Sequence, residues 1–264
     1  MGERLRGGGR PPAPAFPITP RTAGEAAGAA AWYLAPPAWP KPRVVRFSWK
    51  RTLGTLYVKP ASVFGGPSMF GRKLGPARGR VTVPAGAKLL LEVSENGARD
   101  LSPLAQLGPR DLQMVSLMSS GATDDALAHL RDLTWLEWLD LASSNVTGTG
   151  LVHLGGMRLL EQLDLWGTDL TADGLAHLPE LPHLRRLTLS LNLELTGGGL
   201  EHLVGRVPAL EALDVHSNDI GDDAVPHLRR LTGLRELDVR YTGISRDGVE
   251  ELLAALPYCR ISIH

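Results

Sequence analysis

The sequence predicts an α/β solenoid, in which a small β-rich region precedes stacked units that each contain one strand and one short helix. Two observations predict this fold. A leucine-led pattern returns about every 24 residues beyond Asp111, and composition and charge change near residue 91. With 264 residues, 43% of them hydrophobic, the chain is long enough for an extensive packed core.

The formal net charge of zero conceals two halves of opposite charge. Residues 1–90 contain 15 Lys or Arg and 2 acids, whereas residues 91–264 contain 13 Arg, no Lys and 26 acids. Such an asymmetry indicates two regions with different surfaces, and it allows for different partners.

The first 42 residues are rich in Gly, Pro and Ala, as in GGGRPPAPAFPITP and LAPPAWPKP. This composition offers few side chains that could be buried, so we predict a mostly disordered tail over residues 1–42. From Val44 the pattern changes to short runs of β-branched and aromatic residues bounded by Gly and Pro: VVRFSW, GTLYV, RVTVP and KLLLEV. We therefore predict a basic β-rich cap and a connecting segment over residues 43–111.

Residues 112–264 form six units and a C-terminal half unit. Each unit begins with L-x-x-L-x-L, as in LEWLDL, LEQLDL and LRRLTL, and the fourth unit carries two extra residues around LNLELTGGG, where we expect a local bulge. The opening positions are Leu112, Leu136, Leu160, Leu184, Leu210 and Leu234, and the half unit opens at Tyr258.

Two further positions recur in the units. Eight residues after each opening stands a residue that can hydrogen-bond a neighbouring backbone, as stacked turns require: Ser120, Ser144, Thr168, Asn192, Asn218 and Thr242. A helix N-cap is predicted three residues later at Thr123, Thr147 and Thr171, with Thr196 and Ser245 as later equivalents and Gly221 as an exception.

The unit L-x-x-L-x-L-x-x-T-x-L-T-D-x-G-L-x-x-L resembles that of leucine-rich repeat proteins of a bacterial type. The likeness covers residues 112–264, and a weaker one covers the preceding β region. A strand and a short helix cannot bury their own apolar faces, so the units must stack. We expect parallel strands on the concave face of an arc and short helices on the convex face.

Open ends of such a stack expose apolar residues and unpaired strand edges. We expect residues 44–94 to cover the first end, while Tyr258, Ile261 and Ile263 supply the inward positions of a last strand. The single cysteine, Cys259, falls on a position outside the core, and we predict no catalytic role for its thiol.

Alternation of side chains along a strand assigns a face to each residue. In the third unit Leu163 and Leu165 point inward, and Asp164 and Trp166 point to the concave face. Extended to all units, the pattern predicts a concave surface of aromatics, acids and arginines, typical of a protein-binding face. The predicted partner-binding residues are Trp138, Asp140, Asp164, Trp166, Arg186, His216, Arg240 and Tyr241.

The Trp166 indole has two possible roles. It can be displayed for a partner, or it can lie flat across its small lateral neighbours, Ala142 and Ser190, and shield its own sheet. A core position would require a register slip that turns Leu163 and Leu165 outward.

The period also predicts two columns of titratable side chains. The histidines could bind a metal, but a surface position copied with each unit explains them more simply. The carboxylates would lie ~5 Å apart and repel each other. An aspartate copied with each repeat is the favoured explanation of this column, contact with a basic partner is the second, and catalysis is the third. The columns are His129, His153, His177, His202 and His227, and Asp140, Asp164, Asp214 and Asp238.

The segment from Lys41 to Lys88 carries 11 cationic residues and no acid. Its aromatics are Phe47, Trp49, Tyr57, Phe64 and Phe70. Such a segment could bind nucleic acid, an anionic membrane surface or an acidic protein. Alternatively, the aromatics form the core of the cap and the cations its solvated face.

We predict a non-enzymatic protein–protein interaction scaffold that binds a partner on the concave face. The alternative is a polyanion binder that uses the basic N-terminal region. No nucleophile–base pair or phosphate-binding loop is found in the sequence, and no cofactor or metal is assigned. The lone cysteine and the lack of a run of about 20 apolar residues favour a cytoplasmic protein.

Overall fold

The computed structural model describes residues 39–60 and 71–263. Most of the predicted tail, residues 1–38, lies outside the described residues, as do Phe64 and Phe70 of the basic segment.

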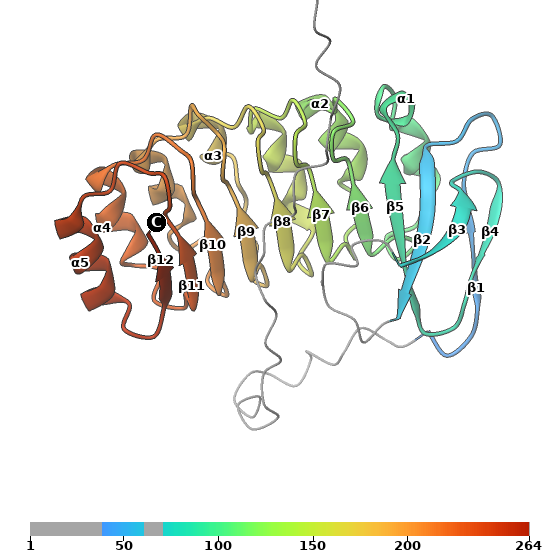
Figure 1. Ribbon diagram of the computed structural model, residues 1–264. Coiled ribbons are helices and arrows are strands. Elements are labelled where there is room, and N and C mark those ends of the chain that lie inside the picture. The colour runs from blue at the N-terminus through green and yellow to red at the C-terminus, as the bar shows by residue number, and fades with distance from the viewer. Residues whose placement is uncertain (1–38, 61–70, 264) are drawn as a thin grey trace, which may run out of the picture.

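A ten-stranded, mostly parallel sheet runs through the described residues (Figure 1). Its parallel strands pair in chain order and are β5 (Ala87–Val93), β6 (Met114–Ser116), β7 (Trp138–Asp140), β8 (Gln162–Asp164), β9 (Arg186–Thr188), β10 (Ala212–Asp214), β11 (Glu236–Asp238) and β12 (Arg260–Ser262). The antiparallel strands β2 (Gly54–Pro60) and β3 (Arg72–Pro76) continue it beyond β5. A second sheet pairs β1 (Arg43–Arg46) with β4 (Arg80–Val83).

Short helical segments alternate with the parallel strands. The α-helices are α1 (Glu95–Ala98), α2 (Asp124–Leu127), α3 (Ala172–Leu175), α4 (Val225–Leu228) and α5 (Arg246–Ala255). In Figure 1, α4 and α5 are seen at the left, beside β12. The 3-10 segments are η1 (Ser102–Gln106), η2 (Ala128–Leu130), η3 (Thr149–Gly156), η4 (Gly197–Leu203) and η5 (Asp222–Ala224). The predicted stacking of strand-and-helix units is confirmed. No helix among the described residues is long and apolar enough to span a membrane.

The repeated leucines form one continuous core between the strands and the helical segments. In each unit the three leucine-type positions of L-x-x-L-x-L are buried, as in Leu160, Leu163 and Leu165, each at most 1% exposed. Because every unit buries its leucines against the next, the stacking of units supplies most of the apolar burial.

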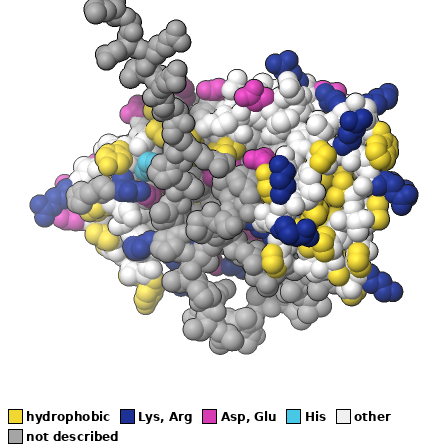
Figure 2. Space-filling view, turned by 45° about the vertical axis from the view of Figure 1, so that its right-hand side comes forward, with side chains coloured by type: hydrophobic (Ala, Val, Ile, Leu, Met, Phe, Trp, Pro, Cys, Tyr) yellow, Lys and Arg dark blue, Asp and Glu magenta, His cyan; other side chains and the backbone are white. Residues whose placement is uncertain are grey.

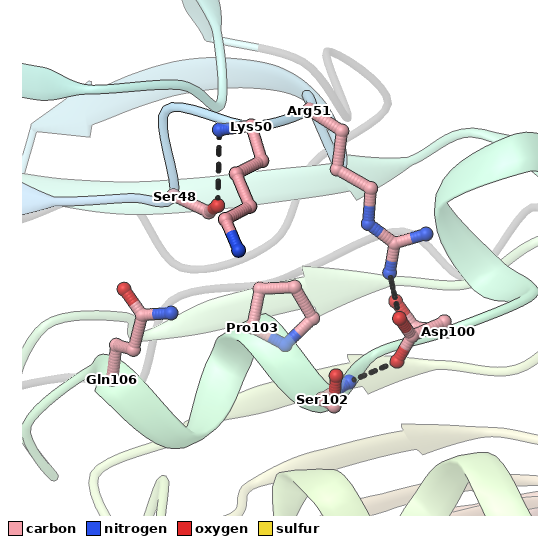
Figure 3. Close-up of a pocket in the computed structure, with 7 residues that line it drawn as sticks. All are labelled: Ser48, Lys50, Arg51, Asp100, Ser102, Pro103 and Gln106. Carbon is pink, nitrogen blue, oxygen red and sulfur yellow. Dashed lines mark hydrogen bonds and ion pairs between the residues drawn. The ribbon is translucent and has the colours of Figure 1, made fainter.

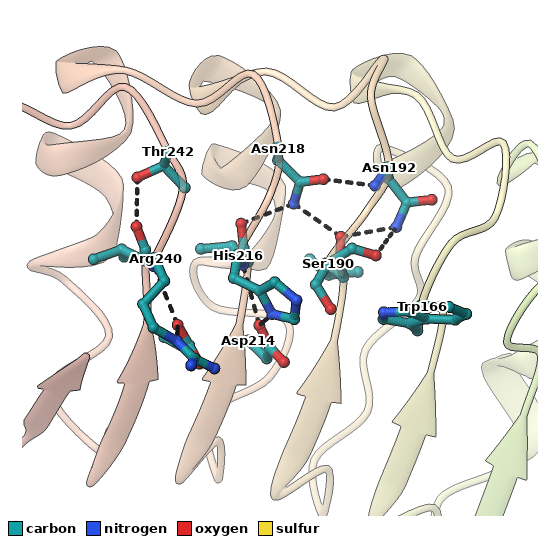
Figure 4. Close-up of polar contacts among 12 residues, drawn as sticks. Trp166, Ser190, Asn192, Asp214, His216, Asn218, Arg240 and Thr242 are labelled. Atoms are coloured by element: carbon teal, nitrogen blue, oxygen red, sulfur yellow. Dashed lines mark hydrogen bonds and ion pairs between the residues drawn. The ribbon is translucent and has the colours of Figure 1, made fainter. Parts of the chain in front are cut away.

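The polar turn residues bond as predicted. The hydroxyl groups of Ser120, Ser144, Thr168 and Thr242 each donate to the carbonyl oxygen three residues earlier. Asn192 Nδ2 donates to the carbonyl of Leu189 in its own unit and to that of Leu165 in the preceding unit, both at 2.8 Å. The amide side chain therefore joins two neighbouring turns, and Asn218 Nδ2 reaches the Leu189 carbonyl of the preceding unit in the same way, at 2.9 Å (Figure 4).

The predicted N-caps hold only in part. Thr171 and Ser245 accept from the backbone N–H three residues on, whereas Thr123 and Thr196 occupy the N-cap position without that bond. Thr147 is not an N-cap, because its hydroxyl group donates to Asp124 and the η3 segment begins after Gly148.

Two details of the repeats differ from expectation. The fourth unit was expected to carry both of its extra residues near LNLELTGGG, but only one lies there, where Leu193 is 73% exposed. The other lies in the following loop, because Leu203 and Leu210 are one residue further apart than Leu178 and Leu184, the equivalent leucines of the third unit. The inward positions predicted for the last strand were wrong for Tyr258 and Ile263, which are 92% and 40% exposed. Of the three residues, Ile261 is the one that packs against the core.

The β region is continuous with the repeats. Strand β5 pairs with β6 in parallel, so eight parallel strands are present among the described residues rather than the seven expected from the repeats alone. Strand β3 was not predicted, since RKLGP lacks β-branched residues and contains Gly75, whose φ is 138°. Although PAGA joins β4 and β5 in sequence, β4 pairs with β1 and β5 with β2.

Candidate functional site

The parallel sheet presents one layer of side chains away from the leucine core, which we call the strand face. Register places equivalent residues of successive units side by side in three rows. The rows are Trp138, Gln162, Arg186, Ala212 and Glu236; Asp140, Asp164, Thr188, Asp214 and Asp238; and, two residues further on, Ala142, Trp166, Ser190, His216 and Arg240.

Seven of the eight predicted partner-binding residues occupy the strand face. The eighth, Tyr241, follows Arg240 in the turn with φ 54° and is 75% exposed. Leu191 and Ser217 adopt the same left-handed conformation in their units. A repeated left-handed turn thus places one residue at this edge in each unit: Ser119, Ser143, Gly167, Leu191, Ser217 and Tyr241.

The carboxylate row has a role within each unit. The Oδ1 atoms of Asp140, Asp164, Asp214 and Asp238 accept the backbone N–H two residues on, at 3.0, 2.9, 3.1 and 3.1 Å. Because each strand ends at this aspartate, the carboxylate stabilises the turn that leaves the strand. This accounts for the recurrence of aspartate without requiring a ligand.

The row is also electrostatically unfavourable at neutral pH. Burial raises the pKa of Asp164 to about 7, and repulsion from Asp140 adds to that rise. Burial likewise raises the pKa of Asp140, against hydrogen bonds from Ala142 and Ser116. Neighbouring members of the row therefore resist being charged together.

Cationic side chains neutralise one end of the strand face and not the other. Arg240 holds both carboxylate oxygens of Asp238, with Nη2 to Oδ2 at 2.6 Å and Nε to Oδ1 at 2.9 Å. Arg186 reaches across the small Ala212 to lie 3.8 Å from Glu236. No ion pair involving Asp140 or Asp164 is present among the described residues, so neither carboxylate is neutralised by a cationic side chain there.

The tryptophans lie at the uncompensated end. Trp138 on β7 and Trp166 beyond β8 are both half-buried. The Trp166 indole lies beside Ser190, with its ring nitrogen on that side (Figure 4). Trp166 is thus neither a core residue nor fully displayed, and it leaves part of one ring face open to a contact.

Glu92 is a member of the carboxylate row that sequence reasoning missed. It lies on β5 in register with Ser116, and its Oε2 accepts from the Tyr57 hydroxyl group at 2.9 Å. Only the pairing of β5 with β6 reveals it, because Glu92 precedes the first recognisable repeat. The signal that could have found it is LLLEV, which matches the apolar–polar alternation of LDL.

The five helical histidines lie away from the strand face, on or next to the helical segments. Among the described residues they take part in no group of three metal-ligating side chains within reach of one ion.

Cys259 is half-buried. Burial raises the pKa of its thiol to about 11, and the negative charge of the nearby Glu236 adds a smaller rise. The thiol is therefore protonated at neutral pH and a weak nucleophile.

The β region presents a cationic surface. Arg46 and Arg80 lie directly opposite each other on β1 and β4, and both are exposed. Trp49 is 66% exposed next to Arg78, whose Nε donates to its carbonyl oxygen at 2.8 Å. Figure 2 shows Lys and Arg side chains around apolar ones on this side of the molecule. The predicted core role holds for Phe47, 4% exposed, but not for Trp49.

An open cavity of about 470 Å³ lies between the β1–β2 loop and η1 (Figure 3). Its lining is polar: Ser48, Lys50, Arg51, Asp100, Ser102, Pro103 and Gln106. Arg51 Nη2 pairs with Asp100 Oδ2 at 2.7 Å, and Asp100 accepts from the Ser102 N–H at 2.9 Å. These bonds join the β region to the connecting segment, and the lining offers no nucleophile next to a base.

Comparison with known protein families matches part of the repeat region. The family described as Leucine Rich repeat matches residues 208–225 and 230–253. A comparison with curated proteins found no match.

Three solved structures are similar. An internalin C2 from Listeria monocytogenes is 22% identical with a TM-score of 0.47, and the match covers 66% of this chain and 80% of that one. A leucine-rich repeat protein from Leptospira interrogans gives 22% and 0.39, covering 51% and 33%. A tropomodulin C-terminal domain from Caenorhabditis elegans gives 16% and 0.35, covering 40% and 75%.

Proposed function

Because this chain is a leucine-rich repeat protein whose units resemble those of bacterial members, we propose that it is a non-enzymatic scaffold that binds a protein partner on the strand face. Stacked repeats generally offer such extended binding surfaces, since each unit adds one set of side chains to a rigid sheet. We propose further that the strand face is the concave side of an arc.

The observation that carries this proposal is the set of uncompensated carboxylates beside tryptophans. Asp140 and Asp164 lie in register with no cation of the described part of the chain paired to either, and Trp138 and Trp166 flank them. Half-buried tryptophans on a rigid support are typical of residues that dominate binding energy. A Lys or Arg side chain of a partner would relieve the repulsion between the two aspartates. We therefore propose a partner segment that is basic and carries an apolar anchor.

The β region of residues 43–93 is, in this proposal, the cap that covers the first end of the stack. A second candidate function, polyanion binding, is favoured there by Arg46 and Arg80, which lie opposite each other on β1 and β4 and form no ion pair within residues 39–60 and 71–263. That cationic surface would give an affinity that falls steeply with salt.

The test is quantitative capture of partners from the source cell's lysate on the immobilised full chain. The strand-face variant Trp166→Ala/Asp164→Asn is expected to recover the bound proteins at least about 10-fold less well, because truncating a central interface residue costs about 2 kcal/mol. Glu180→Gln, an exposed acid between α3 and β9, is the matched control and should capture as the wild type does.

Equal capture by the strand-face variant and the wild type would refute the proposal. A third variant, Arg46→Ser/Arg80→Ser, separates the two candidate functions. If it alone loses the captured material, and nuclease treatment removes that material from the wild type, polyanion binding is the function instead.

A further inference from the structure

We propose that Asp214, His216 and Asp238 form a binding site for one divalent transition-metal ion at the cation-rich end of the strand face. The site is independent of the partner-binding proposal, which rests on Asp140 and Asp164 two strands or more away.

Register brings the three side chains together. Asp214 and Asp238 are paired residues on the adjacent strands β10 and β11, and His216 follows Asp214 by two residues on the same face (Figure 4). One potential ligand atom from each residue lies within 4.8 Å of the other two. Among the described residues, this is the one group of three metal-ligating side chains that meets such a condition.

A second observation points to a missing cation. Asp214 is 1% exposed, and its Oδ2 has no hydrogen-bond partner among the described residues. Its Oδ1 is fully used: it accepts the His216 N–H at 3.1 Å and lies 2.6 Å from His216 Nδ1. The Ser190 hydroxyl group, on the preceding unit and 0% exposed, also lacks a partner. Buried carboxylate oxygens are costly when unpaired, and a bound cation would satisfy this one.

The ligand set indicates the class of metal. One imidazole nitrogen and two carboxylate oxygens suit Zn²⁺, Mn²⁺, Fe²⁺ or Co²⁺, whereas Ca²⁺ and Mg²⁺ prefer oxygen ligands alone. Three protein ligands leave at least one position for water or for a ligand atom supplied by another molecule.

Arg240 competes with the metal for Asp238. Its guanidinium group binds both oxygens of that carboxylate, so the ion can enter only where the arginine gives up one of them. The Arg240 side chain is 41% exposed and can turn toward solvent. Removing it would free Asp238 and also remove a positive charge from the site.

The experiment is titration of the full-length, metal-free protein with Zn²⁺ by isothermal calorimetry, followed by the visible absorption spectrum of the Co²⁺-loaded protein. The wild type is expected to bind one ion per chain. Asp214→Asn and His216→Gln should each weaken binding at least about 10-fold, as loss of one ligand does. Asp214→Asn keeps an oxygen for the His216 N–H, and circular dichroism checks that each variant is folded.

Two matched controls accompany these variants. Asp219→Asn, an exposed acid of the same unit, and His202→Gln, a histidine of η4, should bind Zn²⁺ as the wild type does. Arg240→Ala should bind at least as tightly as the wild type. If the wild type binds no ion, or if His216→Gln retains the ion while His202→Gln loses it, the site is not the one proposed. Partner capture does not enter this test, so either proposal can fail without the other.

Discussion

Asp164 illustrates how a single residue of this protein combines a structural and a functional property. Its Oδ1 stabilises the turn after β8 by accepting the Trp166 N–H at 2.9 Å. The same side chain, raised in pKa to about 7 by burial and by Asp140, is charged only in part at neutral pH. A basic partner would favour the charged form, so binding and ionisation of this residue are linked.

The pH dependence of stability tests this state of Asp164. Because its pKa is raised in the folded protein, the folded state binds more protons than the unfolded state between about pH 4 and 7, and stability falls as pH rises through that range. Asp164→Asn cannot ionise, and Asn still offers an oxygen to the Trp166 N–H. We expect the variant to exceed the wild type in free energy of unfolding at pH 8 by on the order of 1–3 kcal/mol, and to lose most of that advantage at pH 5.

Urea unfolding at the two pH values measures the effect. Asp169→Asn, an exposed acid in the same unit, should follow the wild type at both. An advantage of Asp164→Asn that is the same at pH 5 and pH 8 would show that Asp164 is not the titrating group.

At the scale of elements, an acidic side chain at the start of one helical segment accepts hydrogen bonds from the start of the next helical segment. Asp124, the first residue of α2, accepts from the Thr147 N–H and hydroxyl group at 2.9 and 2.8 Å, and from the N–H groups of Gly148 and Gly150 at 3.1 and 2.6 Å. Burial alone would raise the pKa of Asp124, but these hydrogen bonds outweigh it and lower the pKa. Gly150 is required there, since a Cβ would lie 2.6 Å from the Asp124 carbonyl oxygen.

Replacing Asp124 with alanine should therefore loosen two units rather than one. We expect Asp124→Ala to lower the free energy of unfolding by about 2–3 kcal/mol, because a charged hydrogen-bond acceptor is lost and several N–H groups lose their partner. Asp125→Ala removes the exposed acid next to it and should change stability by less than about 0.5 kcal/mol. Equal effects of the two substitutions, measured by urea unfolding, would contradict this role.

At the scale of the whole molecule, buried polar contacts join the β region to the repeats. Arg43 donates to the Ala87 carbonyl at 2.9 Å and to Gln113 Oε1 at 2.8 Å. Lys88 of β5, 2% exposed, forms an ion pair with Glu137, which precedes β7. These bonds cross the boundary between the basic and acidic halves of the chain, so the charge asymmetry is partly neutralised inside the molecule.

The Lys88–Glu137 ion pair gives a prediction about that joint. Lys88→Met should destabilise the protein by about 3–5 kcal/mol, since Glu137 is left as an unpaired buried charge. The double variant Lys88→Met/Glu137→Met removes both charges and should regain most of that loss. Thermal and urea unfolding of the two variants measure this effect. If the double variant is no more stable than Lys88→Met, the contribution of Lys88 to stability does not come from its ion pair with Glu137.

The sequence by itself determined the features that depend on local periodicity. The 24-residue period and the alternation in LDL set which side chains are buried, because a strand turns successive side chains to opposite faces. This pattern also sets the strand-face positions of Asp140, Asp164 and Trp166. It further sets the turn positions of six polar residues: Ser120, Ser144, Thr168, Asn192, Asn218 and Thr242.

The tertiary structure decided the features that depend on pairing between distant segments. Local pattern does not specify whether β4 pairs with β1 or β5, that β5 extends the parallel sheet, or that Glu92 joins the carboxylate row. It also does not show that Tyr258 is exposed, or that one oxygen of Asp214, beside His216 and Asp238, has no hydrogen-bond partner among the described residues. Burial and hydrogen bonding at those residues are properties of neighbours that only the folded chain brings together.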